Sequence, residues 1–108
     1  MSRTSPRCQP VPQEVRQTAD LLERRWQLSI LYAALTGALR FNEFAAAVPG
    51  ISPRMLSERL RDLEAAGLIE RTVLASSPPK AEYRLTERGR RLAPLIEAMR
   101  AYAREPVV

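Results

Sequence analysis

The sequence contains no histidine and a single cysteine among its 108 residues. Without histidine, neither a histidine-ligated zinc site nor a Ser-His-Asp triad can form, and one cysteine cannot build a cysteine-rich metal site. No phosphate-binding loop is present, and Glu58, Asp62 and Glu64 share one predicted helix, where we expect them to be solvated. We therefore predict a protein that is not an enzyme and carries no metal or other cofactor.

Long hydrophobic runs are missing as well. No apolar stretch approaches the roughly 18 residues of a membrane span, and no hydrophobic signal segment follows the first residues. A single cysteine cannot form the intrachain disulfides that stabilise small secreted folds, so we expect a cytoplasmic protein without membrane contact. Hydrophobic residues still make up 45% of the chain, which is enough for the core of one small domain.

Basic residues outnumber acidic ones, with 17 Lys and Arg against 12 Asp and Glu and a formal net charge of +5. Lys80 is the only lysine, and every other basic residue is arginine. A positive balance indicates a polyanionic partner such as DNA, RNA or an anionic membrane surface, and the guanidinium group suits phosphates and guanine edges. Codon bias in a GC-rich genome explains the ratio of Arg to Lys equally well, but it does not explain the net charge.

The first half of the chain predicts three helices. Residues 1–10 are polar and are expected to form a flexible N-terminal arm. Apolar spacing predicts a helix over residues 12–23 and a second, central and buried helix from Trp26 to Leu35, which Gly37 ends. A short third helix is expected to begin at an N-cap on Asn42 and to run through Val48.

The second half predicts a helix, a hairpin and a final helix. Ser52 followed by Pro53 is typical of a helix start, and this fourth helix is expected to reach Ala66. Residues 68–74 and 81–85 predict two strands joined by a proline-rich turn. Thr86 is a candidate cap for a final helix to Arg104, which Pro94 should kink. The predicted domain spans residues 11–104, with a short tail at 105–108.

This order of elements predicts a mainly α-helical fold with a small β-hairpin wing, that is, a winged helix-turn-helix over residues 38–85. Three leucines of the fourth helix, Leu56, Leu60 and Leu63, share one face, which leaves a polar face opposite. In a helix-turn-helix the second helix enters the major groove, with its N-terminal residues at the base edges. The positions expected to contact DNA lie on that polar face and on the wing: Ser52, Pro53, Arg54, Ser57, Arg61, Arg71, Lys80 and Arg84.

Different roles are expected within this set. Arg54 is the candidate for reading a base, because arginine can span two acceptors of guanine. Arg61, and Lys80 at the Pro-Pro turn, are expected to contact phosphates. An ordinary solvated surface is the alternative for all of them. Arg59 has a helical phase close to the leucine stripe, so we expect a structural role and a pairing with Glu43 of the third helix.

Five segments of the sequence closely resemble a known family. The most specific are Pro49-Gly50-Ile51-Ser52-Pro53 and the Glu-Tyr-x-Leu-Thr motif at residues 82–86. The resemblance covers about residues 8–102 and is to the HxlR-type branch of the MarR-like winged-helix transcription regulators, through residues 26–31, 40–44, 49–64, 67–71 and 82–89.

The resemblance implies a homodimer that binds an inverted-repeat DNA operator and regulates nearby genes, with the terminal helices forming the dimer interface. The apolar faces of these helices exceed the needs of a small core, which is consistent with pairing across a two-fold axis. Packing within one chain is the alternative, and we prefer it for Leu92. The interface residues expected on this basis are Val11, Val15, Leu22, Leu95, Ile96, Met99 and Tyr102.

The resemblance also implies a role for Cys8, because many members of the family sense oxidants or electrophiles through a cysteine near the N-terminus. Arg3 and Arg7 lie close in sequence, and positive charge lowers the pKa of a thiol. An inert cysteine is the alternative. Members commonly have Cys-Pro here, whereas in this chain Gln9 separates Cys8 from Pro10.

The leading hypothesis is a sequence-specific DNA-binding transcription regulator that acts as a homodimer and responds to oxidants or electrophiles through Cys8. Two alternatives remain, a winged-helix protein-interaction module and a nonspecific DNA binder. A small-molecule effector site is conceivable near Trp26, Tyr32 and the dimer interface. These aromatic side chains are more simply explained as part of the core.

Overall fold

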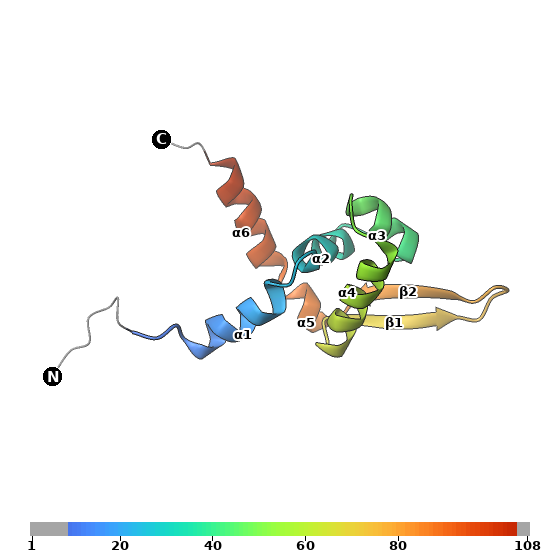
Figure 1. Ribbon diagram of the computed structural model, residues 1–108, viewed down its shortest axis with the longest axis horizontal. Coiled ribbons are helices and arrows are strands. Elements are labelled where there is room, and N and C mark those ends of the chain that lie inside the picture. The colour runs from blue at the N-terminus through green and yellow to red at the C-terminus, as the bar shows by residue number, and fades with distance from the viewer. Residues whose placement is uncertain (1–8, 106–108) are drawn as a thin grey trace.

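A computed structural model describes residues 9–105 of the chain. Six helices and one two-stranded antiparallel sheet follow one another in this part (Figure 1): α1 (Gln13–Leu22), α2 (Gln27–Leu35), α3 (Phe41–Ala47), α4 (Pro53–Ala65), β1 (Ile69–Leu74), β2 (Lys80–Leu85), α5 (Glu87–Arg90) and α6 (Ala93–Arg104). The mainly helical class, the hairpin and the order of the elements confirm the prediction from the sequence. No helix of the described part combines the length and the apolar character that crossing a bilayer requires.

The core lies between α2, α3, α4 and the base of the hairpin. Helix α2 supplies two fully buried side chains, Ile30 and Leu31, as its apolar character predicted. The three leucines of α4 all point inward, while Phe44 of α3 fills the space between the helices. Burying such side chains is the main source of folding free energy, so the position of α4 is set by packing along one whole face.

Local signals fix both ends of α4. The Ser52 Oγ accepts a hydrogen bond of 3.1 Å from the main-chain N–H of Met55, and Pro53 occupies the first turn, as expected for an N-cap followed by proline. At the other end the helix stops at Ala65, and Gly67 has a φ of +76°, which favours glycine.

Helix α3 begins earlier than predicted. Its N-cap is Arg40 rather than Asn42, and the helix runs from Phe41 to Ala47. The reason is Glu43, whose Oε1 accepts hydrogen bonds from the main-chain N–H groups of Leu39 (2.7 Å) and Arg40 (3.0 Å). These two hydrogen bonds lower the pKa of Glu43, and they satisfy donors at the helix start that would otherwise lack a partner.

The hairpin has a fixed register that assigns its side chains to two faces. Ile69 lies opposite Leu85 and Arg71 lies opposite Tyr83, so these four side chains share the face toward the helices. Glu70 lies opposite Arg84 on the other face. The main-chain N–H of Tyr83 also donates to the carbonyl of Leu39 (2.8 Å), which ties the start of α3 to the outer side of β2.

The predicted continuous final helix is wrong, because the chain forms two helices. Thr86 caps α5 as expected, with its Oγ1 accepting from the N–H of Gly89 at 3.0 Å. Helix α5 ends at Arg90, and α6 begins at Ala93 with Pro94 in its first turn rather than as a kink in its interior. Gly89 is buried against the carbonyl of Leu68, which leaves no space for a β-carbon and presses α5 onto the hairpin.

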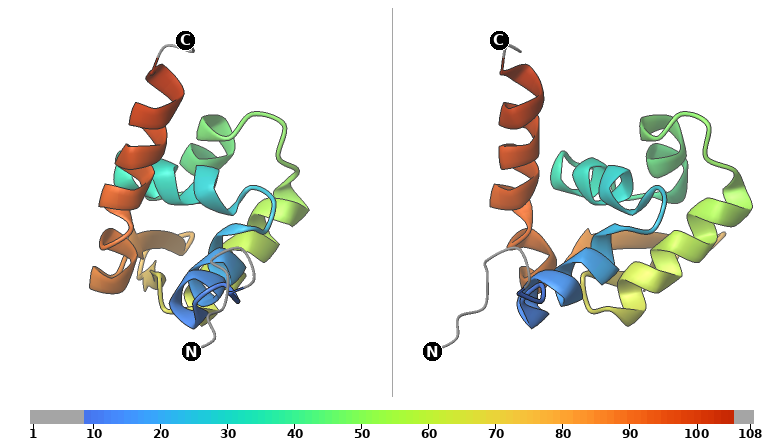
Figure 2. Two further views of the ribbon diagram at one scale, coloured as in Figure 1. Left: turned by 90° about the vertical axis from the view of Figure 1, so that its left-hand side faces the viewer. Right: turned by 60° about the vertical axis from the view of Figure 1, so that its left-hand side comes forward.

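Helices α1 and α6 project from the core on the side away from the hairpin (Figure 1). No residue of α1 is buried, and Leu21 and Leu22 at its C-terminal end pack against the core. Helix α6 rises beside α2 (Figure 2). It contributes one buried side chain, Ile96. The arrangement is therefore a winged helix-turn-helix with two protruding terminal helices.

Candidate nucleic-acid interface

The N-terminus of α4 is exposed and carries three of the residues predicted to contact DNA. Ser52, Pro53 and Arg54 are all exposed there. The side chain of Arg54 is 90% exposed, and its Nε lies 3.6 Å from the Glu58 Oε2, one turn along the same helix. An exposed pair of this length contributes little, so the guanidinium can leave Glu58 for a stronger partner. The Ser52 hydroxyl already serves the helix cap, and its role is therefore structural at least in part.

Farther along the polar face, α4 and the hairpin meet in a polar cleft. Ser57 and Arg61 of α4 line one side of it, and Arg71 of β1 lines the other. The structure thus brings together three of the predicted residues that lie up to 14 positions apart in the sequence. An amphipathic helix and a hairpin arm present these groups on one side of the molecule.

The two remaining predicted residues of the hairpin lie differently. Lys80 is exposed as the first residue of β2, directly after the turn. Arg84 lies on the face opposite to Arg71, where its Nη2 contacts the Glu82 Oε1 at 2.8 Å. We therefore leave Arg84 out of the DNA-contacting set, because register and pairing turn it away from the cleft.

Arg59 is structural, as predicted, but the predicted pairing with Glu43 is wrong. Its Nη1 contacts the Asp62 Oδ2 at 2.6 Å, and its Nε donates to the carbonyl of Arg25 at 3.0 Å. The same Asp62 oxygen accepts from Arg24 at 2.7 Å. Asp62 is therefore not the freely solvated carboxylate that the sequence suggested. It joins the segment between α1 and α2 to the C-terminal half of α4.

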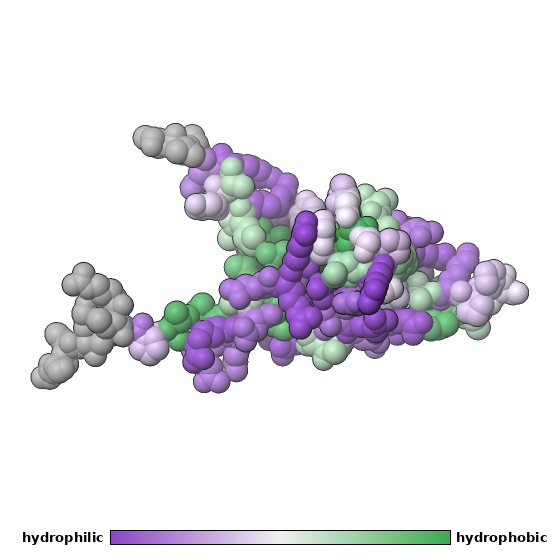
Figure 3. Space-filling model, viewed as in Figure 1, coloured by the Kyte–Doolittle hydropathy of each residue, from purple (hydrophilic) through white to green (hydrophobic). Residues whose placement is uncertain are grey.

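The predicted dimer residues divide into two groups. The first group is exposed to solvent: Met99 has 46% and Tyr102 has 80% of its surface accessible. Its other members are Val11, Val15 and Leu95. Figure 3 shows hydrophobic surface on both projecting helices. Ile96 is only 5% exposed because it packs into the chain's own core, and Leu22 is half-buried against that core. Ile96 and Leu22 have little exposed surface that could contact a second subunit. They belong to the core of their own chain, and the prediction that they lie in the dimer interface is corrected.

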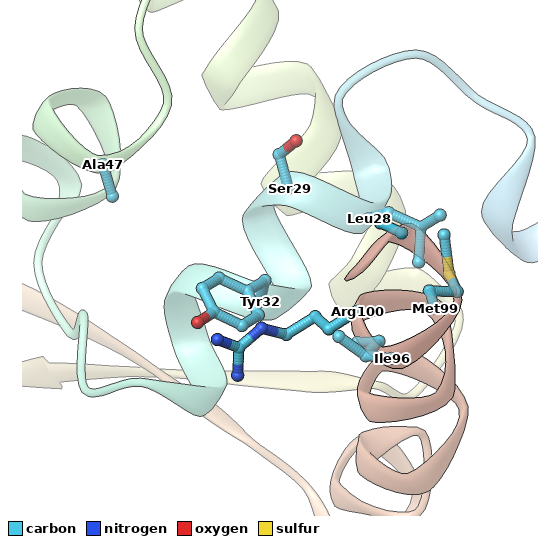
Figure 4. A pocket seen from close by; sticks show the side chains of 8 residues that line it. Leu28, Ser29, Tyr32, Ala47, Ile96, Met99 and Arg100 are labelled. Carbon is cyan, nitrogen blue, oxygen red and sulfur yellow. The ribbon is translucent and has the colours of Figure 1, made fainter. Parts of the chain in front are cut away.

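An open hollow of about 480 Å³ lies between α2 and α6. Tyr32, Ile96, Met99 and Arg100 line it (Figure 4), and the Arg100 guanidinium carbon lies 5.6 Å from the centre of the Tyr32 ring. Trp26 is not part of this hollow. It begins α2 with a φ of +78° and lies beside Gly50, while Arg25 stacks on its ring at 4.5 Å. Leu92 packs against the core, as predicted.

Cys8 and most of the predicted N-terminal arm and C-terminal tail lie outside the described residues. Two residues of the candidate interface were not predicted from the sequence. Tyr83 and Glu64 line the same cleft as Arg61. The alternation of Ala81, Tyr83 and Leu85 puts these three side chains on one face of a strand, and this pattern could have placed Tyr83 toward the helices.

A helix-turn-helix core, an exposed N-terminus of the second helix and a basic hairpin beside it define the class of winged helix-turn-helix DNA-binding proteins. Residues 21–107 match the family described as HxlR-like helix-turn-helix, and the chain belongs to this family. Two relatives come from Bacillus subtilis. The uncharacterized HTH-type transcriptional regulator YvaP is 40% identical over 89 residues, which is 82% of each chain. The HTH-type transcriptional regulator YodB is 41% identical over 83 residues, 77% of this chain and 74% of that protein.

Solved structures give the same result. The redox regulator HypR in its reduced form superimposes with a TM-score of 0.78 at 41% identity, covering 83% of this chain and 89% of that chain. The reduced form of YodB from B. subtilis gives a TM-score of 0.76 at 36% identity, covering 87% and 92%. This chain is therefore a transcription regulator with a helix-turn-helix DNA-binding fold, and it is not an enzyme.

Proposed function

We propose that the chain regulates transcription as a homodimer that binds an inverted-repeat operator in the cytoplasm. The observation that carries this proposal is the exposed start of α4, where Arg54 lies beside the helix N-terminus with only a weak partner. Arg54 reads a guanine in the major groove, Ser57 contacts a base or a phosphate, and Arg61, Arg71 and Lys80 contact phosphates. Two copies place their α4 helices about 34 Å apart, one turn of DNA.

The dimer forms through α1 and α6. Four large apolar side chains are exposed on these two helices and a fifth, Val11, lies just before α1; large exposed apolar surfaces on a monomer are typical of protein interfaces. Helix α1 supports this assignment further, since none of its residues is buried within the chain. The domain of residues 11–104 is then the unit that folds and pairs, with residues 1–10 as an arm and 105–108 as a tail.

Cys8 makes the regulator responsive to oxidants or electrophiles. Support comes from the similar structures, one of which is named a redox regulator in its reduced form, while another is diamide-treated YodB. Since the chain has one cysteine, a reversible disulfide joins Cys8 to the second subunit or to a small thiol. The hollow beside Tyr32 is where a small-molecule effector would bind, because its mainly apolar lining includes one guanidinium group.

A fluorescence-anisotropy titration tests the proposal, comparing DNA from upstream of the chain's own gene with random DNA at physiological salt. We expect a preference of about a thousandfold or more for the upstream DNA. Arg54→Ala should reduce this preference at one base position, while Lys80→Ala should weaken binding to every sequence equally. Repeating the titration with a thiol oxidant, for the wild type and for Cys8→Ser, tests the redox response.

Other results would favour one of the alternatives. Equal binding to both DNAs, with Arg54→Ala weakening both equally, would indicate a nonspecific DNA binder. Absence of DNA binding even at low salt would contradict the proposal and favour a winged-helix module that binds a protein partner. A redox response that persists in Cys8→Ser would exclude Cys8 as the sensor.

A further inference from the structure

The polar cleft between α4 and the hairpin has the features of a binding site for a single charged group. It has a volume of about 320 Å³ and lies between two elements that the proposed function places against DNA. Two of its six lining residues are arginines, two carry hydroxyl groups and one is a glutamate. The lining comprises Ser57, Leu60, Arg61, Glu64, Arg71 and Tyr83.

The two arginines of the cleft have no carboxylate partner, whereas six of the other twelve arginines among residues 9–105 do. Among residues 9–105, neither Arg61 nor Arg71 takes part in an ion pair, whereas Arg54, Arg59 and Arg84 each do. Both are exposed, so solvent or an external anion can reach them. Their guanidinium groups are therefore available for an external ligand.

The walls of the cleft are held by the core. Leu60 is fully buried beneath it, and Tyr83 packs its ring edge-to-face against Phe44, with ring centres 6.2 Å apart at 89°. Arg71 lies directly opposite Tyr83 in the hairpin register, two residues out from the buried pair Ile69 and Leu85. The side chains that reach into the cleft thus start from fixed positions, which reduces the entropy lost on binding a ligand.

The geometry of DNA indicates which part of the duplex would lie in this cleft. One backbone strand separates the major groove from the adjacent minor groove. When α4 lies in the major groove and the hairpin approaches the neighbouring minor groove, that strand must pass between them. The charges agree, because two guanidinium groups and one carboxylate give the cleft a net charge of +1, opposite to the single negative charge of a phosphodiester.

We propose that this cleft, which we call the phosphate seat, holds one DNA backbone phosphate. Arg61 and Arg71 contact it from its two sides, and the Tyr83 hydroxyl donates a further hydrogen bond. Glu64 opposes the bound phosphate and so keeps binding to arbitrary DNA weak. This inference rests on the proposed function, but it adds two residues, and it requires that both arginines act on the same phosphate.

The salt dependence of DNA binding tests whether the phosphate is shared. Affinity for a fluorescently labelled random duplex is measured as a function of salt, where each neutralised phosphate contributes about 0.9 to the slope of log K against log salt. We expect the double variant Arg61→Ala/Arg71→Ala to lose about 0.9 of slope in total, since one phosphate is lost. A loss of about 1.8 would mean two separate phosphates and would overturn the proposal.

A second double variant tests the same point. In Arg61→Ala/Lys80→Ala, Arg71 still neutralises the shared phosphate, so the slope should fall by only about 0.9, from the lost Lys80 contact. A fall of about 1.8 would mean that Arg61 holds a phosphate of its own and would overturn the proposal. Arg84→Ala, on the opposite face of the hairpin, should leave the slope unchanged. If the wild type bound no DNA at low salt, the proposed function itself would fail. If it bound and only the double variants disagreed with expectation, the phosphate seat alone would fail.

Two further variants test the added residues. Tyr83→Phe keeps the ring against Phe44 and should weaken binding about three- to tenfold without altering the salt slope, because no charge is lost. Glu64→Gln should bind the random duplex a fewfold more tightly. Unchanged affinity in Tyr83→Phe, or weaker binding in Glu64→Gln, would contradict these assignments, provided that the melting temperatures equal that of the wild type.

Discussion

The central helices and the terminal helices differ in how much of their apolar surface is buried. In the centre, α2, α3, α4 and the base of the hairpin turn theirs inward, and eight large side chains are almost completely buried. At the ends, α1 buries none of its residues and α6 buries only Ile96. The central part is complete as a single chain, whereas the terminal helices still have apolar surface to cover. This division separates the proposed DNA-contacting surface from the proposed subunit contact.

The largest expected effect tests the centre. Leu60→Ala removes a fully buried side chain of α4 and should lower the free energy of unfolding by about 2–5 kcal/mol. Urea unfolding followed by circular dichroism measures the change. Ser57→Ala, on the polar side of the same helix, should change it by less than about 0.5 kcal/mol. Equal effects of the two substitutions would contradict the assignment of the core face.

The next effect tests the terminal helices. Leu95→Glu combined with Met99→Glu places two carboxylates on the exposed apolar face of α6, and each would be unpaired when buried in a dimer. The dimer dissociation constant should rise about 100-fold or more, as measured by sedimentation equilibrium. Ala101→Glu is the control, since this residue is exposed on another side of α6. A wild-type chain that sediments as a monomer would contradict the proposed dimer.

A smaller effect tests the contact between the α1–α2 segment and α4. Arg59→Ala leaves the carbonyl of Arg25 without its donor and removes one of two cations from Asp62. We expect a loss of about 1–2 kcal/mol in unfolding free energy with little change in the salt slope of DNA binding. Arg61→Ala, two residues away, should leave the free energy of unfolding nearly unchanged and should weaken DNA binding. A melting temperature unchanged by Arg59→Ala would exclude the structural role.

The smallest effect concerns pH. The pKa of Glu43 is lowered from its ordinary value of 4.5, mainly by the hydrogen bond from Leu39 and then by that from Arg40. A lowered pKa in the folded state means that this stabilisation is complete above the ordinary pKa and is lost as the pH falls through the lower value. The melting temperature should therefore fall more below pH 4.5 in the wild type than in Glu43→Gln. Parallel pH profiles would argue against this contribution.

Local patterns were enough to predict much of the fold. The Ser52–Pro53 start of α4 and the glycines after α2 and α4 follow from short-range chemistry, so the structure agrees with the sequence there. The leucine stripe of α4 identified its buried face for the same reason. Such signals act over one or two helical turns, and neighbouring residues alone determine them.

Predictions failed where a distant group decided the outcome. The start of α3 depends on a side chain that reaches back to Leu39, and the helix break before α6 accompanies the close approach of Gly89 to Leu68. For the candidate interface, the sequence identified the basic residues but not their faces. The hairpin register separates Arg71 from Arg84, and register depends on pairing between strands.

The class of protein follows from the sequence alone, because helix starts, strand alternation and charge are properties of neighbouring residues and of composition. Which surfaces remain available depends on the tertiary structure. It turned Ile96 inward, gave Arg59 the partners Asp62 and Arg25, and brought Arg61 next to Arg71 in one cleft. These outcomes depend on distances between elements far apart in the chain, which packing of the core sets and which no local pattern encodes.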